Sequence, residues 1–94
     1  MKILAISKEP NPVDWDNKEA ILQDEARVAY DLFLSGRIRE IYFTEDYNAV
    51  LVLETRDLEE AREVVNLLPL VKAKLLEFDL MELNPYTGFS RIMK

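Results

Sequence analysis

The sequence predicts an α+β fold in which a four-stranded antiparallel sheet carries two helices on one face. Four segments rich in branched and aromatic residues have the composition of strands, and two others repeat apolar residues at helical spacing. Their order along the chain is β-α-β-β-α-β, which is the split βαβ arrangement of ferredoxin-like domains. Because 94 residues is a usual length for one domain, we expect residues 1–94 to form a single domain.

The first strand is expected at residues 1–7, since Pro10 and Pro12 in the following loop cannot donate to a strand ladder. The first helix is expected from about residue 17 to residue 35. Asp16 or Asn17 can cap its start, and Gly36 supplies the left-handed position that commonly ends a helix. Its apolar residues recur at spacings of three and four, at Ile21, Leu22, Ala26, Val28, Ala29, Leu32 and Phe33.

The next two strands are expected at residues 37–43 and 49–55, joined as a hairpin by the polar turn 44–48. Residues 49–53 are apolar at every position, so both faces of this strand should be covered. This pattern predicts a central strand.

The second helix should begin after Asp57, which with Glu60 has the form of a capping box. Pro69 should end it near residue 67 or 68. Its buried stripe is predicted to be Leu58, Ala61, Val64, Val65 and Leu68. The last strand is expected at residues 75–83, followed by a turn-rich tail at residues 84–89.

Two helices cover only one face of such a sheet, while the central strand is apolar on both faces. The simplest cover for the second face is another copy of the same sheet, packed about a twofold axis. The sequence therefore predicts a homodimer.

Composition excludes several classes of function. The formal net charge is −6 and the basic residues form no block, so we expect no nucleic-acid partner and no anionic membrane surface. No apolar stretch is long enough for a membrane span or a signal peptide, and we expect a cytoplasmic protein. The chain has no cysteine and no histidine, which excludes thiolate nucleophiles, imidazole metal sites and Ser-His-Asp catalysis. Any acid or base must be Asp, Glu, Lys or Tyr.

The last strand carries carboxylates at alternate positions. Side chains alternate across a strand, so Leu76, Phe78 and Leu80 should face the helices. Glu77 and Asp79 should then face the predicted dimer, roughly 7 Å apart from the rise of a strand. They either form edge ion pairs of small net value, with Arg37 or Arg39 as counter-charge, or they act on a ligand. Which face of the second strand Arg39 and Glu40 occupy is left open.

Three sequence features resemble the muconolactone isomerase-like and YCII-like group of dimeric α/β-barrel proteins, over nearly the whole chain. They are residues 36–43 (GRIREIYF), Leu68-Pro69-Leu70-Val71 after the second helix, and Asn84-Pro85-Tyr86 in the tail. The resemblance implies obligate dimers with back-to-back sheets, often in larger rings. It also implies pockets for small, mostly apolar organic acids or lactones, handled without metal or organic cofactor.

The chain departs from two branches of this group. YCII-like members use a His-Asp pair and the haem-degrading members use a histidine. This chain has no histidine, so neither of those activities is expected. Isomerisation by proton transfer needs only carboxylate, Tyr and Lys chemistry.

The sequence thus leads to one hypothesis and one alternative. The hypothesis is a cofactor-independent isomerase-type enzyme or ligand binder, in which Glu40, Glu77 or Asp79 moves a proton. Arg39, Tyr42 or Tyr86 would orient the substrate. The alternative is a non-catalytic oligomeric module, for binding or as an accessory subunit, in which the same charges are interface ion pairs.

Overall fold

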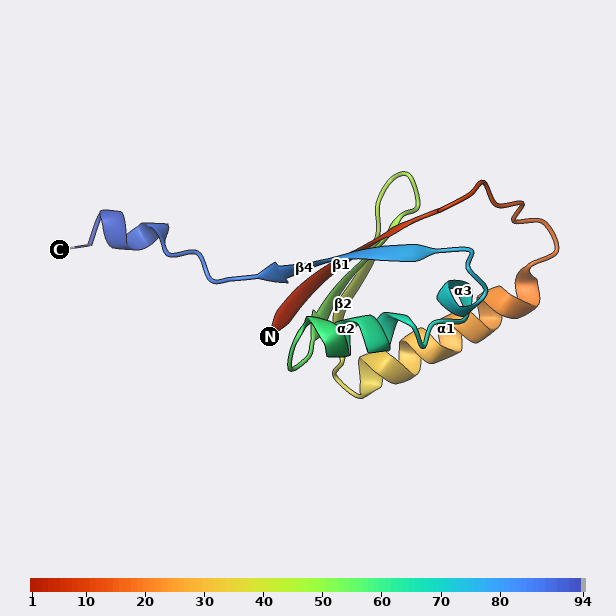
Figure 1. The fold of residues 1–94 in the computed structure, drawn as a ribbon, viewed down its shortest axis with the longest axis horizontal. Coiled ribbons are helices and arrows are strands. Elements are labelled where there is room, and N and C mark those ends of the chain that lie inside the picture. The colour runs from red at the N-terminus through yellow and green to blue at the C-terminus, as the bar shows by residue number, and fades with distance from the viewer. Residues whose placement is uncertain (94) are drawn as a thin grey trace.

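The computed structural model describes residues 1–93 and has the predicted order of elements (Figure 1). The strands are β1 (Lys2–Lys8), β2 (Ile38–Phe43), β3 (Ala49–Glu54) and β4 (Glu77–Leu83). The main helices are α1 (Glu19–Leu34) and α2 (Leu58–Val65), and two single turns are added, α3 (Pro69–Lys72) and η1 (Gly88–Arg91).

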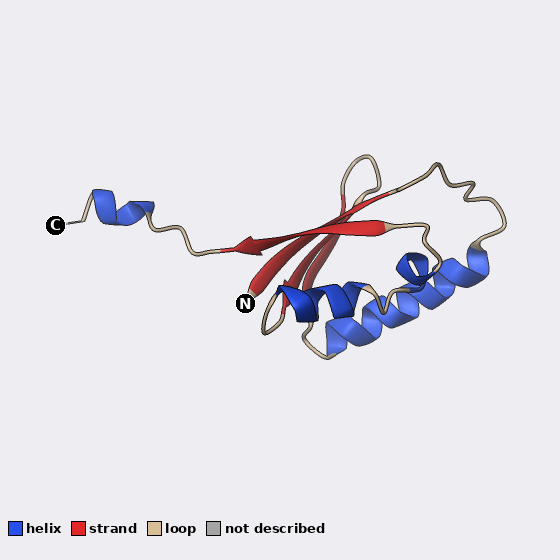
Figure 2. Cartoon of the chain, in the orientation of Figure 1, coloured by secondary structure: helices blue, strands red, loops and turns tan. Residues whose placement is uncertain are grey.

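The four strands form one antiparallel sheet in the order β2-β3-β1-β4. α1, α2 and α3 lie on the same face of it (Figure 2). The predicted fold class is confirmed, and so is the central place of β3, which is apolar along both faces. We call the face without helices the open face.

The strand register decides which side chains meet the helices. Ile3 and Ala5 of β1 and Leu51 and Leu53 of β3 are buried beneath the helices. Phe78 and Leu80 of β4 pack against this core, as the alternation predicts. The other residues of these strands point to the open face, where the apolar ones are Leu4, Ile6, Val50, Val52, Met81 and Leu83.

α1 ends as predicted but begins differently. Gly36 has φ +82°, and the N–H groups of Gly36 and Arg37 donate to the carbonyls of Phe33 and Leu32, which is the Schellman ending. At the start, Lys18 is the N-cap and no side chain caps the helix. The cap expected from Asp16 or Asn17 is wrong, because Asn17 is held at φ +59° in the turn that precedes the helix.

The second helical region is interrupted where a single helix was expected. Asp57 caps α2, accepting from the Glu60 N–H at 2.8 Å, but the Glu60 carboxylate reaches back to the Arg56 N–H rather than to Asp57. α2 ends at Val65, and Pro69 begins α3, where a missing N–H costs nothing. Ala61, Val64, Val65 and Leu68 are buried as predicted, whereas Leu58 is exposed.

The last strand is shorter than predicted at its start. The N–H groups of Leu75 and Leu76 both donate to the carbonyl of Leu70 in α3. These two residues therefore belong to the turn after α3, and β4 begins at Glu77.

An irregularity marks the edge strand β2. Between Ile38 and Glu40 the register with β3 shifts, so that Arg39 is an extra residue in the ladder. Beyond it, Glu40 pairs with Val52 and Tyr42 with Val50, which places both on the open face.

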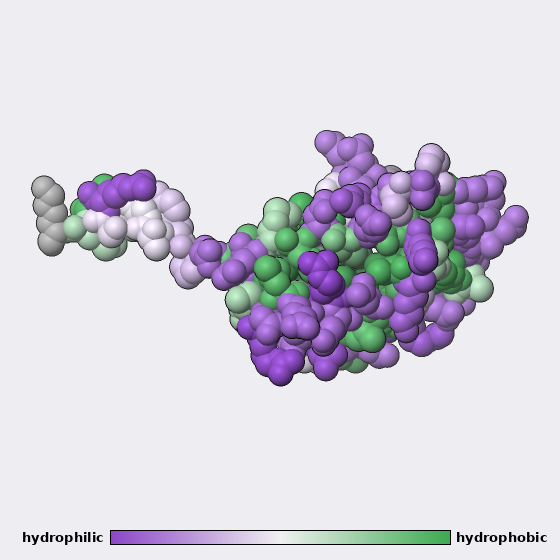
Figure 3. Space-filling model, in the orientation of Figure 1, coloured by the Kyte–Doolittle hydropathy of each residue, from purple (hydrophilic) through white to green (hydrophobic). Residues whose placement is uncertain are grey.

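Residues 84–93 form a tail that extends from β4 away from the sheet and helices (Figures 1 and 3). It gives the molecule its long dimension, 60 × 27 × 20 Å. Its exposed apolar residues are Tyr86, Phe89, Ile92 and Met93.

We expect Leu53→Ala to lower the free energy of unfolding by about 2 to 5 kcal/mol, because it leaves a cavity at a side chain with no exposed surface. Urea denaturation measures the change. Leu34→Ala, at an exposed position of α1, is the control and should change the stability little. Equal effects of the two substitutions would contradict the assignment of the core.

Candidate functional site

An apolar groove of about 1060 Å³ lies between α1 and the helix-covered face of the sheet. It is large enough for a small organic ligand. β2, the start of β3 and the start of β4 form one wall and α1 forms the other, with the loop before α1 and the β2–β3 turn at the mouth. In the space-filling view, apolar surface reaches solvent in several patches between polar side chains (Figure 3).

The groove exists because α1 does not pack fully onto the sheet. Of the α1 side chains only Leu32 is buried, while Leu22 and Phe33 are 42% and 48% exposed. The small side chains of Ala26 and Ala29 leave space on the same face of the helix. The α1 residues of the wall are Leu22, Glu25, Ala26, Ala29, Tyr30 and Phe33.

Aromatic side chains are concentrated in this groove. Seven of the nine in the chain line it, and the other two, Tyr86 and Phe89, are in the tail. Phe43 and Tyr47, at the β2–β3 turn, have ring centroids 6.1 Å apart and are 73% and 81% exposed. The seven are Trp15, Tyr30, Phe33, Tyr42, Phe43, Tyr47 and Phe78. Such a lining is suited to a flat, mostly apolar ring compound.

Ser7 places a hydroxyl on the wall formed by the sheet. Its side chain is buried and its Oγ accepts a hydrogen bond from the Ala49 N–H at 2.7 Å. Among the hydrogen bonds of residues 1–93, the Ser7 hydroxyl is the donor in none. Its proton is therefore available to a ligand oxygen.

Glu25 places a carboxylate on the opposite wall. It is half-buried, and its Oε1 accepts from the Leu70 N–H at 3.0 Å. Burial raises the pKa of Glu25 above its ordinary value, and the hydrogen bond from Leu70 opposes this only in part. A carboxylate with a raised pKa in an apolar groove is the arrangement expected of a general base.

The sequence analysis did not single out Glu25, although a signal was present. Glu25 lies three residues after Leu22 and four before Ala29, so it falls within the apolar stripe of α1. A carboxylate in that stripe indicates either an ion pair or a functional group.

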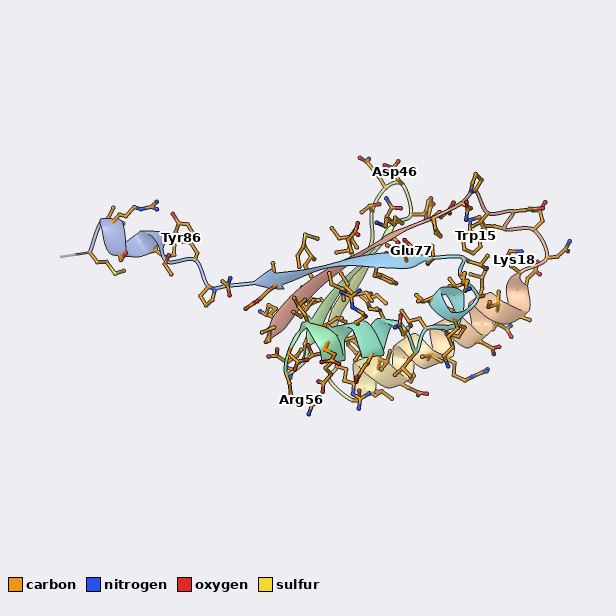
Figure 4. All side chains as sticks on the ribbon, viewed as in Figure 1. Trp15, Lys18, Asp46, Arg56, Glu77 and Tyr86 are labelled. Carbon is orange, nitrogen blue, oxygen red and sulfur yellow. The ribbon has the colours of Figure 1, made fainter. Side chains whose placement is uncertain are left out.

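Two acidic side chains and an indole lie at the mouth. The Trp15 indole N–H donates to Glu9 Oε1 at 3.1 Å, and Asp46 lies at the tip of the β2–β3 turn (Figure 4). Trp15 is partly exposed and lies near the start of α1 (Figure 4). It forms part of the wall and is held there by Glu9.

The carboxylates singled out on the last strand lie outside the groove. Glu77 and Asp79 are exposed on the open face, and Asp79 pairs with Lys8 of β1 at 2.9 Å. The hydrogen bond from Lys8 to Asp79 raises the pKa of Lys8. The counter-charge is therefore Lys8 on the neighbouring strand, and within one chain neither Arg37 nor Arg39 pairs with Asp79.

The other predicted site residues are divided among three places. Tyr42 borders the groove from the edge strand β2, but its hydroxyl lies on the open face, where it donates to Glu40 at 2.8 Å, and this bond raises the pKa of Tyr42. Arg39, at the bulge, donates to the Gly36 carbonyl at 2.7 Å. Tyr86 lies in the tail against Phe89, with ring centroids 5.0 Å apart, away from all the others (Figure 4). The structure joins Glu40 to Tyr42 and places Glu77 beside Asp79 on one strand face, but it does not bring all six residues together.

Within residues 1–93, no group of three or more acidic side chains is placed to hold a metal ion. None of the helices in this range is both long and apolar enough to cross a membrane.

Comparison with known proteins gives a clear result for the fold. A scan of protein-family models and a search of curated protein sequences give no match. The crystal structure of muconolactone isomerase superposes with a TM-score of 0.75 at 21% identity, covering 94% of this chain and 93% of that one. The chain has the muconolactone isomerase-like fold.

A second solved structure supports the same fold. It is 5-chloro-2-hydroxyhydroquinone dehydrochlorinase (TftG) from Burkholderia phenoliruptrix AC1100, in complex with 2,5-dihydroxybenzoquinone. The TM-score is 0.66 at 14% identity, covering 92% of this chain and 97% of that one. At 21% and 14% sequence identity, these two comparisons show a similarity of fold.

The raised pKa of Glu25 predicts how stability changes with pH. Because the folded protein holds this proton to higher pH than the unfolded chain does, stability should fall as pH rises from about 4.5 through the folded pKa. Glu25→Gln keeps an acceptor for the Leu70 N–H and removes the charge. We therefore expect the variant to gain stability relative to wild type between pH 4 and pH 7, measured by urea denaturation.

The control is Asp31→Asn, which removes one charge from an exposed position of α1 that takes part in none of the four ion pairs of residues 1–93. It corrects for the general effect of net charge on stability. If, after this correction, Glu25→Gln changes the free energy of unfolding by the same amount at pH 4 and at pH 7, burial does not raise the pKa of Glu25.

Proposed function

We propose that this chain binds a small, mostly apolar organic acid or lactone in the groove and acts on it by proton transfer without a cofactor. The observation that carries the proposal is the half-buried Glu25 carboxylate in an aromatic-lined groove, with its pKa raised by burial. The two structures with the same fold belong to proteins named for a lactone and for a hydroxylated ring compound, which supports a small cyclic ligand.

The chemistry needs two groups on opposite walls. Glu25 would take a proton from a carbon next to a carbonyl, since a base works best when its pKa approaches the working pH. The free hydroxyl proton of Ser7 would stabilise the negative charge that develops on the carbonyl oxygen. Return of the proton from Glu25 to another carbon completes an isomerisation.

The open face offers a second place for the same chemistry, as the sequence analysis proposed. There Glu40, Glu77 or Asp79 would be the base, and Arg39, Tyr42 or Tyr86 would orient the substrate. The Glu40–Tyr42 hydrogen bond and the Lys8–Asp79 pair favour it, because both lie on the face that a second copy would cover. In this arrangement the site is complete only in the homodimer.

We also propose that the chain forms a homodimer. Contacts made by the tail would join such dimers into a larger ring. Val50 and Val52 on the central strand and Leu4 and Ile6 on β1 leave an apolar open face. The tail adds apolar side chains that are exposed among residues 1–93. These two surfaces equally support the alternative, a non-catalytic oligomeric module for binding or as an accessory subunit.

Ligand binding in the groove is tested by a thermal-shift screen of aromatic acids and lactones. A ligand should raise the melting temperature of wild type, because it binds the folded state alone. Ala26→Trp should abolish the shift by filling the groove, whereas Ala20→Trp, on α1 outside the groove, should retain it. A screen without any shift would favour the non-catalytic module.

For a ligand that is turned over, Glu25→Gln should lower kcat about 100-fold or more while binding persists. Glu77→Gln and Asp79→Asn should leave kcat unchanged. If instead Glu77→Gln or Asp79→Asn lowers kcat and Glu25→Gln does not, the reaction takes place on the open face.

The dimer is tested by sedimentation. We expect wild type to sediment as a dimer or larger assembly, and Val52→Lys to dissociate it by placing a charge at the centre of the open face. Leu34→Lys, at an exposed position of α1, is the matched control. A well-folded wild-type monomer at micromolar concentration would contradict this assembly.

A further inference from the structure

All the charged side chains that line the groove are acidic. They are Glu9, Glu25 and Asp46, and among residues 1–93 no lysine or arginine lines it. Lys18 lies near Trp15 at the start of α1 but is not part of the lining (Figure 4). The whole chain carries a formal charge of −6, so the rest of the molecule adds to the negative potential.

The carboxylates have few partners to neutralise them. Glu9 accepts from the Trp15 indole and Glu25 from the Leu70 N–H, and both donors are neutral groups. The four ion pairs of residues 1–93 include neither Glu9, Glu25 nor Asp46. No cation of residues 1–93 therefore neutralises these carboxylates, and each has at least one oxygen free for a ligand.

A ligand carboxylate would bind poorly in these surroundings. It would lose water to an apolar groove and meet three like charges without a cation to pair with. A hydroxyl or amine on the same ring would instead donate to the free oxygen of Glu25. A positive charge would also be attracted by the faces of Trp15, Tyr30 and Tyr47.

We propose that the groove selects uncharged or cationic ring compounds bearing a hydrogen-bond donor, and rejects ring compounds bearing a carboxylate. This inference rests on the proposed function of the groove and narrows it, by removing ring compounds that bear a carboxylate from the ligands it accepts. Glu25, the least exposed of the three, is the residue that sets the preference.

The test uses three compounds of one size: 2-naphthylmethanol, 2-naphthylmethylamine and 2-naphthoate. Dissociation constants are measured by calorimetry at low salt with the full chain. We expect 2-naphthoate to bind about tenfold more weakly than the alcohol, and the amine to bind at least as tightly as the alcohol. The difference between naphthoate and the alcohol should shrink in 1 M salt, because salt screens partly exposed charges.

Two substitutions assign the preference to the groove. Glu25→Gln and Asp46→Asn should each bring the naphthoate and alcohol constants closer, with the larger effect at Glu25. Glu59→Gln, on α2 outside the groove, should leave their ratio unchanged. Asp46 is at an exposed turn, so its variant gives a result even where Glu25→Gln changes the fold.

The outcomes separate this inference from the proposed function. Naphthoate binding as tightly as the alcohol overturns the inference and leaves ligand binding in the groove intact. A preference for the alcohol that neither Glu25→Gln nor Asp46→Asn alters overturns the role given to the acidic lining. Absence of binding by all three compounds overturns both the inference and the proposed function.

Discussion

The structure depends on a sheet whose two central strands are apolar on both faces. β1 buries Ile3 and Ala5 under the helices while Leu4 and Ile6 point the other way, and β3 repeats the pattern with Leu51 and Leu53 against Val50 and Val52. Water must be excluded from both sides of such a layer, because burial of apolar surface is the main favourable term in folding. The helices provide this on one side, and the need for a cover on the other side is the basis of the proposed assembly.

The helix-covered face is itself only partly filled, and this is the origin of the groove. α2 packs closely through Ala61, Val64 and Val65, while α1 buries Leu32 alone and the groove lies between α1 and the sheet. Close packing at one end of the layer holds the walls in place where they separate. Stability and the proposed ligand binding thus rest on different parts of one apolar layer, so that a substitution in the groove should leave most of the core intact.

The sequence was sufficient for the fold because the strands and helices differ in period and composition. The central place of β3, the end of α1 at Gly36 and the face of Phe78 and Leu80 were all predictable from local patterns. The candidate site was less predictable, because a groove depends on how far α1 lies from the sheet, and no local pattern encodes that distance. The carboxylates of β4 are conspicuous in the sequence because they alternate with apolar residues, whereas Glu25 is one of several charged residues in a helix.

The bulge at Arg39 has a consequence for the exposed edge of the sheet. β2 is an edge strand with apolar residues at Ile41 and Phe43, and a regular edge of that kind attracts further strands from other molecules. The extra residue breaks the even spacing of donors and acceptors at the start of β2, and it holds the guanidinium against the Gly36 carbonyl. A foreign strand cannot align along the full length of this edge, so the irregular residue opposes uncontrolled polymerisation through β2.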